Sequence, residues 1–288
     1  MTPFELLKPQ SLAAAIAALD PDDPGVRPLA GGTALMLIMK AGLFQPTRLV
    51  SLERIEPRYS SVELTEAGDL RIGAMVPLTV LEHADGVAAR FPVIARTLRG
   101  VSNVRVRNVA RVGGAFAHGD PHMDLPPLLA ALGARVAIAG PRGTRELPVE
   151  DLYLGYYETA LARDELIAEV TVPAMRERSA AYVKVTTRTA DDWPALGLAV
   201  CFDLQHGCMR DVRIIASAAT EKVTRLRATE KLLENAPASD ALLRQAGDAA
   251  VSEVSLIADA HGSASYKREL LRVTVRRALQ QALSSRSH

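Results

Sequence analysis

Histidine and aspartate alternate along one short stretch of the chain, at His118, Asp120, His122 and Asp124. Imidazole and carboxylate groups are ligands of zinc, and alternate residues of an extended segment share one face. A row of side chains does not form a tetrahedron, however, and no further histidine or cysteine cluster completes the set, so we predict no metal site. We expect instead a loop with a turn at Asp120-Pro121, in which Asp124 caps the next helix and is placed to accept hydrogen bonds from a ligand.

Two glycine pairs suit a different chemistry, the binding of phosphate. Gly31-Gly32 lies where an expected strand passes into a helix, and Gly113-Gly114 lies just before the histidine-aspartate stretch. Glycine allows close backbone approach, and a helix start offers unpaired N–H donors with a positive dipole end. The first pair alone also fits an ordinary tight turn. Our central expectation is that bare peptide N–H groups at both bends converge on one diphosphate.

The segment between Gly86 and Gly119 contains no acidic residue but six arginines: Arg90, Arg96, Arg99, Arg105, Arg107 and Arg111. A local excess of positive charge on a chain of net charge +1 indicates an anionic neighbour. That neighbour is a diphosphate or an acidic patch on a partner, unless carboxylates from elsewhere in the chain pair with these arginines.

The composition excludes several classes of protein. A net charge of +1 and 4% aromatic residues argue against a nucleic-acid partner, and no apolar run is long enough to span a membrane. Two cysteines are too few for a disulfide framework or an iron–sulfur cluster, so a cytoplasmic location is expected. No nucleophile–base pair stands out, so we assign no catalytic residue.

The elements expected around these motifs divide the chain into three parts. In the first, Ser11 caps a helix and a buried helix spans 34–40; the second has helical sequence at 79–100. The third has a hairpin turning at His206-Gly207, followed by three helices at 221–235, 239–259 and 265–284. On the last helix we interpret the cations as a solvated face: Lys267, Arg268, Arg272, Arg276 and Arg277.

Two stretches, LAGGTALMLIMK and VRNVARVGGAFAHGDPHMDLPPLLAALGA, strongly resemble the FAD-binding medium subunit of molybdenum hydroxylases, the carbon monoxide dehydrogenase and xanthine dehydrogenase family. ELPVEDLYLGYYETALARDELIAEVTVP and YVKVTTRTADDWPALGLAV continue the resemblance over almost the whole chain. It implies an α+β fold with a two-lobed FAD domain of the vanillyl-alcohol-oxidase (PCMH) type. The lobes would span 1–57 and 58–174, and a C-terminal domain with a three-stranded antiparallel sheet and helices would span 175–288.

The resemblance also implies cofactor contacts. The first FAD loop would comprise Leu29, Ala30, Gly31, Gly32, Thr33, Ala34, Leu35 and Met36, and the second Arg111, Val112, Gly113, Gly114 and Ala115. Further candidate contacts are Asp120, Asp124 near the nucleotide end, Ile167 as an apolar contact, and Lys184 near the flavin. A loop beside the flavin ring would carry Arg188, Asp191 and Asp192.

Three of these positions leave alternatives open. Family members usually have Thr or Ser at the position of Arg111 and Asn at that of Ala115, so two polar contacts are lost. Arg111 then either bonds a phosphate directly or points away, which would weaken FAD binding. Lys184 either stabilises negative charge on the reduced flavin or forms a salt bridge with Asp191 or Asp192.

As a family member, the chain would be an electron-transfer subunit. It would take electrons from iron–sulfur clusters of a small subunit, in a complex whose large subunit holds the molybdenum cofactor, and pass them from FAD to an external acceptor. A dimer of heterotrimers is expected. The alternatives are a stand-alone flavin oxidase or reductase of the same fold, and a non-redox scaffold that has lost FAD. The substrate (carbon monoxide, a purine, an aldehyde or an N-heterocycle) and the acceptor (NAD, quinone, cytochrome or oxygen) stay open.

Overall fold

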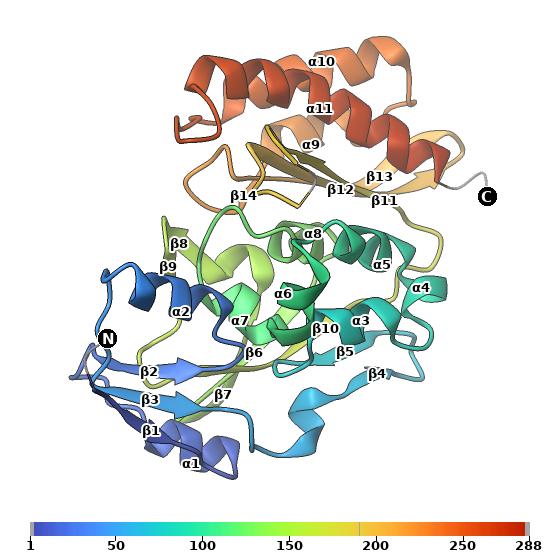
Figure 1. Ribbon diagram of the computed structural model, residues 1–288. Coiled ribbons are helices and arrows are strands. Elements are labelled where there is room, and N and C mark those ends of the chain that lie inside the picture. Colours follow the sequence, from blue (N-terminus) through green and yellow to red (C-terminus); the bar gives the residue numbers. More distant parts are fainter. Residues whose placement is uncertain (1–2, 190, 286–288) are drawn as a thin grey trace.

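A computed structural model describes residues 3–189 and 191–285 and arranges them around three main sheets (Figure 1). The N-terminal lobe, at the lower left of Figure 1, has a parallel sheet of order β1-β3-β2 with two helices. Its elements are β1 (Glu5–Leu7), α1 (Leu12–Ala17), β2 (Val26–Leu29), α2 (Thr33–Lys40) and β3 (Arg48–Ser51). The Ser11 side chain accepts a hydrogen bond from the Ala14 N–H, which confirms the expected N-cap of α1.

The second lobe is an antiparallel sheet of order β4-β5-β10-β6-β7 whose core is closed by helices. The first half of the lobe contains η1 (Pro57–Ser60), β4 (Val62–Leu64), β5 (Leu70–Gly73), α3 (Leu78–His83), α4 (Val87–Arg90), α5 (Pro92–Arg99), α6 (Val104–Val109) and α7 (Val112–Ala117). The second half contains α8 (Leu125–Ala131), β6 (Arg135–Gly140), β7 (Gly143–Pro148), η2 (Val149–Leu152), β8 (Tyr153–Gly155), β9 (Glu158–Thr159) and β10 (Leu166–Val172).

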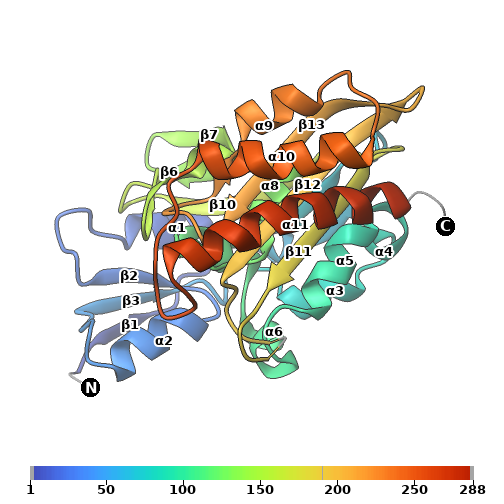
Figure 2. The same cartoon turned by 90° about the horizontal axis from the view of Figure 1, so that it is seen from above.

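The C-terminal domain is an antiparallel sheet covered on one face by helices that lie across its strands (Figure 2). Its elements are β11 (Ser179–Val185), β12 (Leu196–Gln205), β13 (Cys208–Ser217), β14 (Thr224–Arg225), α9 (Arg227–Leu233), α10 (Asp240–Glu253) and α11 (Ala264–Ser284). The hairpin at His206-Gly207 is confirmed, because both residues have positive φ, +50° and +78°, as a tight two-residue hairpin turn requires. The two-residue β14 adds a fourth strand to the three that were expected.

The two faces of the C-terminal sheet belong to different cores. Along β12, Leu198 and Val200 pack under the C-terminal helices, whereas Ala199 and Cys201 join the core of the second lobe. This alternation follows from the two-residue period of a strand. In Figure 1 the sheet accordingly lies between α9, α10 and α11 above and α8 and α5 below. The lower face of the C-terminal sheet and the second lobe therefore share one apolar core, and the C-terminal helices enclose a separate core on the upper face.

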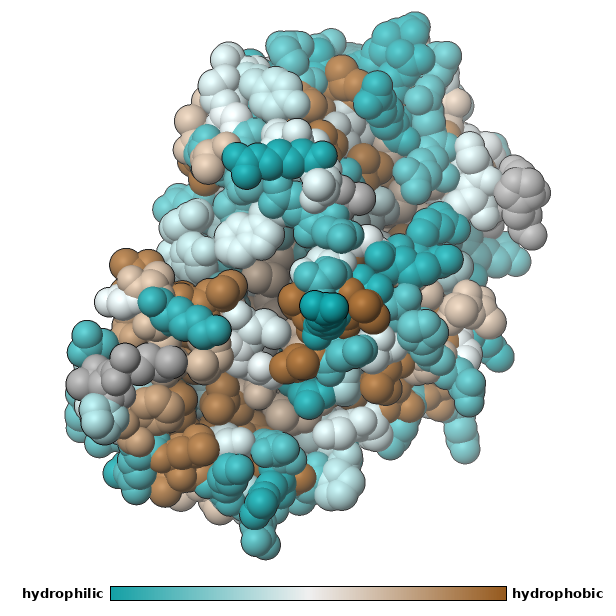
Figure 3. Space-filling view, in the orientation of Figure 1, coloured by the Kyte–Doolittle hydropathy of each residue, from teal (hydrophilic) through white to brown (hydrophobic). Residues whose placement is uncertain are grey.

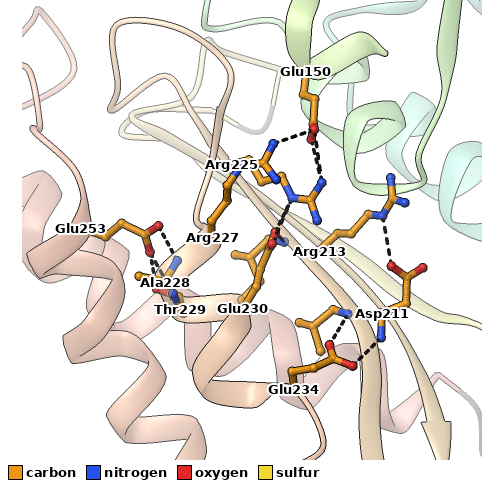
Figure 4. A network of polar contacts seen from close by, with 12 residues as sticks. Glu150, Asp211, Arg213, Arg225, Arg227, Ala228, Thr229, Glu230, Glu234 and Glu253 are labelled. Carbon is orange, nitrogen blue, oxygen red and sulfur yellow. Dashed lines mark hydrogen bonds and ion pairs between the residues drawn. The ribbon is translucent and has the colours of Figure 1, made fainter.

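A polar network also joins the second lobe to the C-terminal domain (Figure 4). The Glu150 carboxylate accepts hydrogen bonds from the guanidinium groups of Arg225 (3.2 Å) and Arg227 (3.0 Å). Arg225 also donates through Nε to Glu230 at 2.9 Å. Arg225 of β14 and Arg227 of α9 therefore bind Glu150 of the second lobe.

The helical sequence expected at 79–100 is confirmed. It forms the three helices α3, α4 and α5, because Pro92 and the left-handed Gly86 (φ +78°) divide it. Helix α2 forms as predicted but is not buried: Met39 is its one buried residue, and Leu37 is 64% exposed. Apolar side chains gather over this lobe in the lower left of Figure 3. Within 3–189 and 191–285, no helix combines the length and hydropathy needed to cross a bilayer.

Candidate functional site

The two glycine bends lie against one another at the junction of the two lobes. A Cβ atom built on Gly31 would stand 2.1 Å from the carbonyl oxygen of Val109, and one on Gly114 would be 3.9 Å from the Cβ of Ala30. Side chains on the first bend would therefore push the segment before α7 away. The structure brings together the two motifs that the sequence separates by about eighty residues.

The first bend presents a helix start. Gly32 is the N-cap of α2 with φ +70°, a left-handed conformation that glycine adopts without strain. The first intrahelical bond joins the Met36 N–H to the Gly32 carbonyl oxygen, so the preceding N–H groups of the first turn lack intrahelical acceptors. These donors and the positive end of the helix dipole suit an anionic group.

The second bend differs from our expectation of bare N–H groups at both of its glycines. The Gly113 N–H donates to the Ala74 carbonyl oxygen at 2.7 Å, and a Cβ on Gly113 would stand 2.6 Å from the Ala74 Cβ. Gly113 therefore serves the packing of α7 against the end of β5. Outside its own helix, the nearest described atom to a Cβ built on Gly114 is the Ala30 Cβ at 3.9 Å, so Gly114 leaves space beside the first bend.

Arg111, the N-cap residue of α7, carries an unsatisfied donor at this junction. Its Nε atom is buried and has no hydrogen-bond partner among the described residues. Burial lowers the pKa of the guanidinium below its usual value, and the charge of Glu53 opposes that effect. Of the six arginines in the acid-free segment, Arg107 behaves differently, since its Nε donates to Glu82 at 3.1 Å. A buried donor without a partner at a helix start is the feature that an anionic ligand would satisfy.

The histidine-aspartate stretch forms the expected loop, and its side chains bind each other. The Asp120 carboxylate accepts hydrogen bonds from the His122 N–H at 2.9 Å and from the Tyr157 hydroxyl at 3.1 Å. The two ring nitrogens of His122 lie 2.8 Å from Asp120 Oδ1 and 3.0 Å from Asp259 Oδ2. Among the described residues, no group of three or more His, Cys, Asp or Glu side chains has a metal-holding arrangement.

Asp259 extends this cluster into the C-terminal domain. Its carboxylate accepts a 2.6 Å hydrogen bond from the Lys267 ammonium, which also donates to the Ala218 carbonyl oxygen at 3.1 Å. Burial would raise the pKa of Asp259, but the hydrogen bonds from Lys267 and His122 outweigh it and lower the pKa. Acidic and basic side chains therefore alternate in this cluster from the second lobe to α11.

Asp124 enters a second buried cluster rather than capping α8, as the sequence suggested. It is the N-cap residue, but its side chain makes no capping bond. Its carboxylate instead accepts hydrogen bonds from the Tyr182 hydroxyl at 2.7 Å and the Lys184 ammonium at 3.1 Å. Burial raises the pKa of the Asp124 carboxyl, and both contacts oppose that rise. Lys184 thus pairs with Asp124 and not with Asp191 or Asp192.

The remaining candidate residues have varied surroundings. Ile167 lies on β10 in the core of the second lobe and is 6% exposed. Arg188 and Asp191 are exposed on the loop between β11 and β12, where the Trp193 N–H donates to Asp192 Oδ1 at 2.8 Å. Their proposed position beside a flavin stays a prediction.

Sequence analysis missed the buried partners of these loops. We had interpreted Lys267 as part of a solvated face, but its side chain is fully buried, so that interpretation was wrong for this residue. A signal was available, because Lys267 lies four and eight residues before the buried Leu271 and Val275 on one helix face. Asp259 and Tyr182 had no such signal.

Comparison with known protein families identifies the family of the chain. Residues 2–175 match the model of the FAD binding domain in molybdopterin dehydrogenase, and residues 181–282 match the CO dehydrogenase flavoprotein C-terminal domain. The chain belongs to the FAD-binding medium subunits of the molybdenum hydroxylase family. Members of this family are subunits of oxidoreductases, and the two-lobed FAD domain with its C-terminal domain is confirmed as the fold.

Individual relatives are similar over nearly their whole length. The chain is 32% identical to the carbon monoxide dehydrogenase medium chain of Hydrogenophaga pseudoflava, covering 97% of this chain and 96% of the relative. It is 31% identical to the nicotine 6-hydroxylase medium subunit of Paenarthrobacter nicotinovorans, with 95% of each covered. The domain seams at 57 and 174 stay predictions.

Solved structures agree closely with the fold. A chain of the carbon monoxide dehydrogenase from Hydrogenophaga pseudoflava, in a form lacking the Mo-pyranopterin moiety, superimposes with a TM-score of 0.94 at 32% identity and covers 99% of both chains. The quinoline 2-oxidoreductase from Pseudomonas putida 86 gives a TM-score of 0.91 at 26% identity, covering 100% of this chain and 99% of that one.

Proposed function

We propose that this chain binds FAD across the two glycine bends and acts as the electron-transfer subunit of a molybdenum hydroxylase. The observation that carries the proposal is the meeting of Gly31 with the Val109 backbone, beside an Arg111 Nε donor that has no hydrogen-bond partner within the described part of the chain. The start of α2 and Arg111 would hold the diphosphate. The surface is hollowed where the N-terminal lobe meets the rest of the molecule (Figure 3).

The bound FAD would supply the redox chemistry, while the chain supplies its position and electrostatics. Besides the two loops, the proposed contacts are Asp120, Asp124, Ile167 and Lys184, with the loop of Arg188, Asp191 and Asp192 beside the flavin ring. Lys184, 13% exposed and paired with Asp124, would stabilise negative charge on reduced flavin.

We further propose that its partners are a small subunit carrying [2Fe–2S] clusters and a large subunit carrying the molybdenum cofactor, in a dimer of heterotrimers. The names of the relatives, a medium chain and a medium subunit, support membership in a multi-subunit enzyme. Both cysteines are free thiols, which fits a reducing compartment such as the cytoplasm.

The test is to purify the chain alone and with its co-expressed partners and to identify the bound cofactors by mass spectrometry. We expect flavin absorption in both samples, bleached by substrate only in the complex; carbon monoxide, a purine, an aldehyde and an N-heterocycle would be compared as substrates. Turnover by the lone chain would favour the stand-alone oxidase. A colourless chain that does not bind added FAD in calorimetry would favour the scaffold.

A further inference from the structure

His122 bridges the two parts of the molecule through both nitrogens of one ring. Nδ1 lies 2.8 Å from Asp120 Oδ1 on its own loop, and Nε2 lies 3.0 Å from Asp259 Oδ2 in the C-terminal domain. A carboxylate is an acceptor only, and neutral imidazole has one N–H group. Both hydrogen bonds therefore form together only when the ring carries two protons.

The neighbouring charged groups carry a net negative charge that balances a positive charge on this ring. Two carboxylates and the Lys267 ammonium leave one negative charge, which an imidazolium at His122 balances. His122 is 6% exposed and Asp120 is 1% exposed, so an unbalanced charge there is costly. Burial would lower the pKa of His122, but its hydrogen bonds to Asp120 and Asp259 outweigh burial, and the pKa is raised above 6.5.

The other groups around this cluster do not replace that charge. The Tyr157 hydroxyl donates to Asp120 at 3.1 Å, and the His118 Nε2 atom lies 4.0 Å from the same carboxylate. Burial lowers the pKa of His118, so this ring loses its proton at a lower pH than His122 does. The rings of Trp193 and His261 lie 5.6 and 5.5 Å from that of His122.

The bridge anchors the loop that follows the second glycine bend. Helix α7 leads directly into this loop, and the Ala218 N–H of the C-terminal domain donates to the Pro121 carbonyl oxygen at 2.9 Å. At the far end of the loop, Asp124 also accepts hydrogen bonds from Tyr182 and Lys184 of β11. The His122 bridge adds a contact between the loop and the C-terminal domain whose strength changes with one proton on the imidazole ring.

We propose that His122 is a positioning residue for FAD: by holding two protons it ties the 118–124 loop to the C-terminal domain and keeps Asp120 and the preceding bend in the binding geometry. This inference rests on the proposed function, and it adds a dependence of FAD affinity on pH. Below pH 6.5 the bridge is complete; as the pH rises through the folded-state pKa of His122, the second hydrogen bond and the charge balance are lost.

The test compares FAD binding by the full-length chain, freed of flavin, at about pH 6 and about pH 9, with flavin fluorescence as the readout. For the wild type we expect affinity to fall roughly tenfold between these values, as for one hydrogen bond to a charged group. His122→Gln should bind with the weaker affinity at both pH values. His122→Arg, a permanent cation, should remove the pH dependence while retaining the tighter binding. His83→Gln, on a 72% exposed side chain, is the matched control and should behave as the wild type.

Equal pH slopes for the wild type and His122→Gln would overturn the inference. Absence of FAD binding by the wild type at every pH would instead refute the proposed function. Should the variants not fold, NMR titration of the wild-type histidines tests the inference instead. If protonation of His122 strengthens FAD binding, then linkage requires that bound FAD raises the pKa of His122. An unchanged His122 pKa on addition of FAD would equally overturn the inference.

Discussion

Gly31 and Val109 are in backbone contact across the two lobes, with room for no side-chain atom between them: a Cβ on Gly31 would lie 2.1 Å from the Val109 carbonyl oxygen. A Gly31→Ala substitution must therefore displace backbone. Gly114, by contrast, has ordinary space for a methyl group, with its nearest atom at 3.9 Å. Substitutions at Gly31 and Gly114 therefore distinguish what the fold requires from what ligand binding requires.

We expect Gly31→Ala to lower the free energy of unfolding by about 2 kcal/mol and to weaken FAD binding, because the contact between the lobes opens. Gly114→Ala should leave stability within about 0.5 kcal/mol but reduce FAD affinity, because its methyl group would intrude on the space left for the diphosphate. Denaturant unfolding and FAD calorimetry measure the two effects. Gly100→Ala, whose Cβ would meet its nearest atom at 3.5 Å, is the control. Unchanged FAD affinity in Gly114→Ala would contradict the proposed diphosphate position.

Removal of the Arg111 side chain should weaken FAD binding without destabilising the chain. Its buried Nε has no partner among the described residues, so Arg111→Ala relieves an unsatisfied donor in the free protein. With FAD, a charge-assisted bond to phosphate would be lost, which corresponds to roughly a tenfold higher Kd. The exposed Arg105→Ala serves as the control in the same calorimetric titration. If both variants bind FAD like the wild type, Arg111 does not contact the phosphate.

Lys184→Met should destabilise the chain strongly, because it leaves the 5% exposed Asp124 carboxylate without its cation. Breaking one side of a buried ion pair costs about 3 kcal/mol, so chemical unfolding should show a loss of that order. The double variant Asp124→Asn/Lys184→Met should be less affected. Lys231→Met, on an exposed position of α9, is the control.

The same Lys184→Met variant tests the electrostatic role of the lysine. If Lys184 stabilises negative charge on reduced flavin, the midpoint potential of the bound flavin becomes more negative in the variant. An unchanged potential would assign the lysine to structure alone.

Asp259→Asn should lower stability in a pH-dependent way. The pKa of Asp259 is lowered below 3.8, so its contribution is present above pH 3.8 and is lost as the pH falls through the folded-state value. At neutral pH the variant leaves the fully buried Lys267 ammonium without a counter-charge, which costs about 3 kcal/mol. Urea unfolding at neutral and acidic pH should show the difference from the wild type shrinking on acidification. Asp240→Asn, with a 65% exposed side chain, should show no comparable loss.

Local patterns predicted much of the fold. The Ser11 cap and the His206-Gly207 hairpin follow from short-range chemistry, and the structure confirms them. The sequence did not predict where the helices between 79 and 100 begin and end. Apolar residues recur on both sides of Gly86 and Pro92, whereas the chain changes direction there.

The candidate site was predictable only in part. The glycine pairs identified the two bends, but Gly113 and Gly114 look alike in sequence, and only the position of Ala74 gives them different roles. In the same way His122 was visible as part of an alternation, whereas its partner Asp259 lies 137 residues away. Such pairings depend on how the domains dock, and no local pattern encodes that arrangement.

The shared interior beneath β12 limits how this subunit can be recombined. A chimera that joined its FAD domain to the C-terminal domain of a relative would set Ala199 and Cys201 against side chains selected for other neighbours. Exchange of these modules, whether by gene fusion in nature or by engineering, therefore requires compensating changes on α8 and α5 as well as a compatible linker.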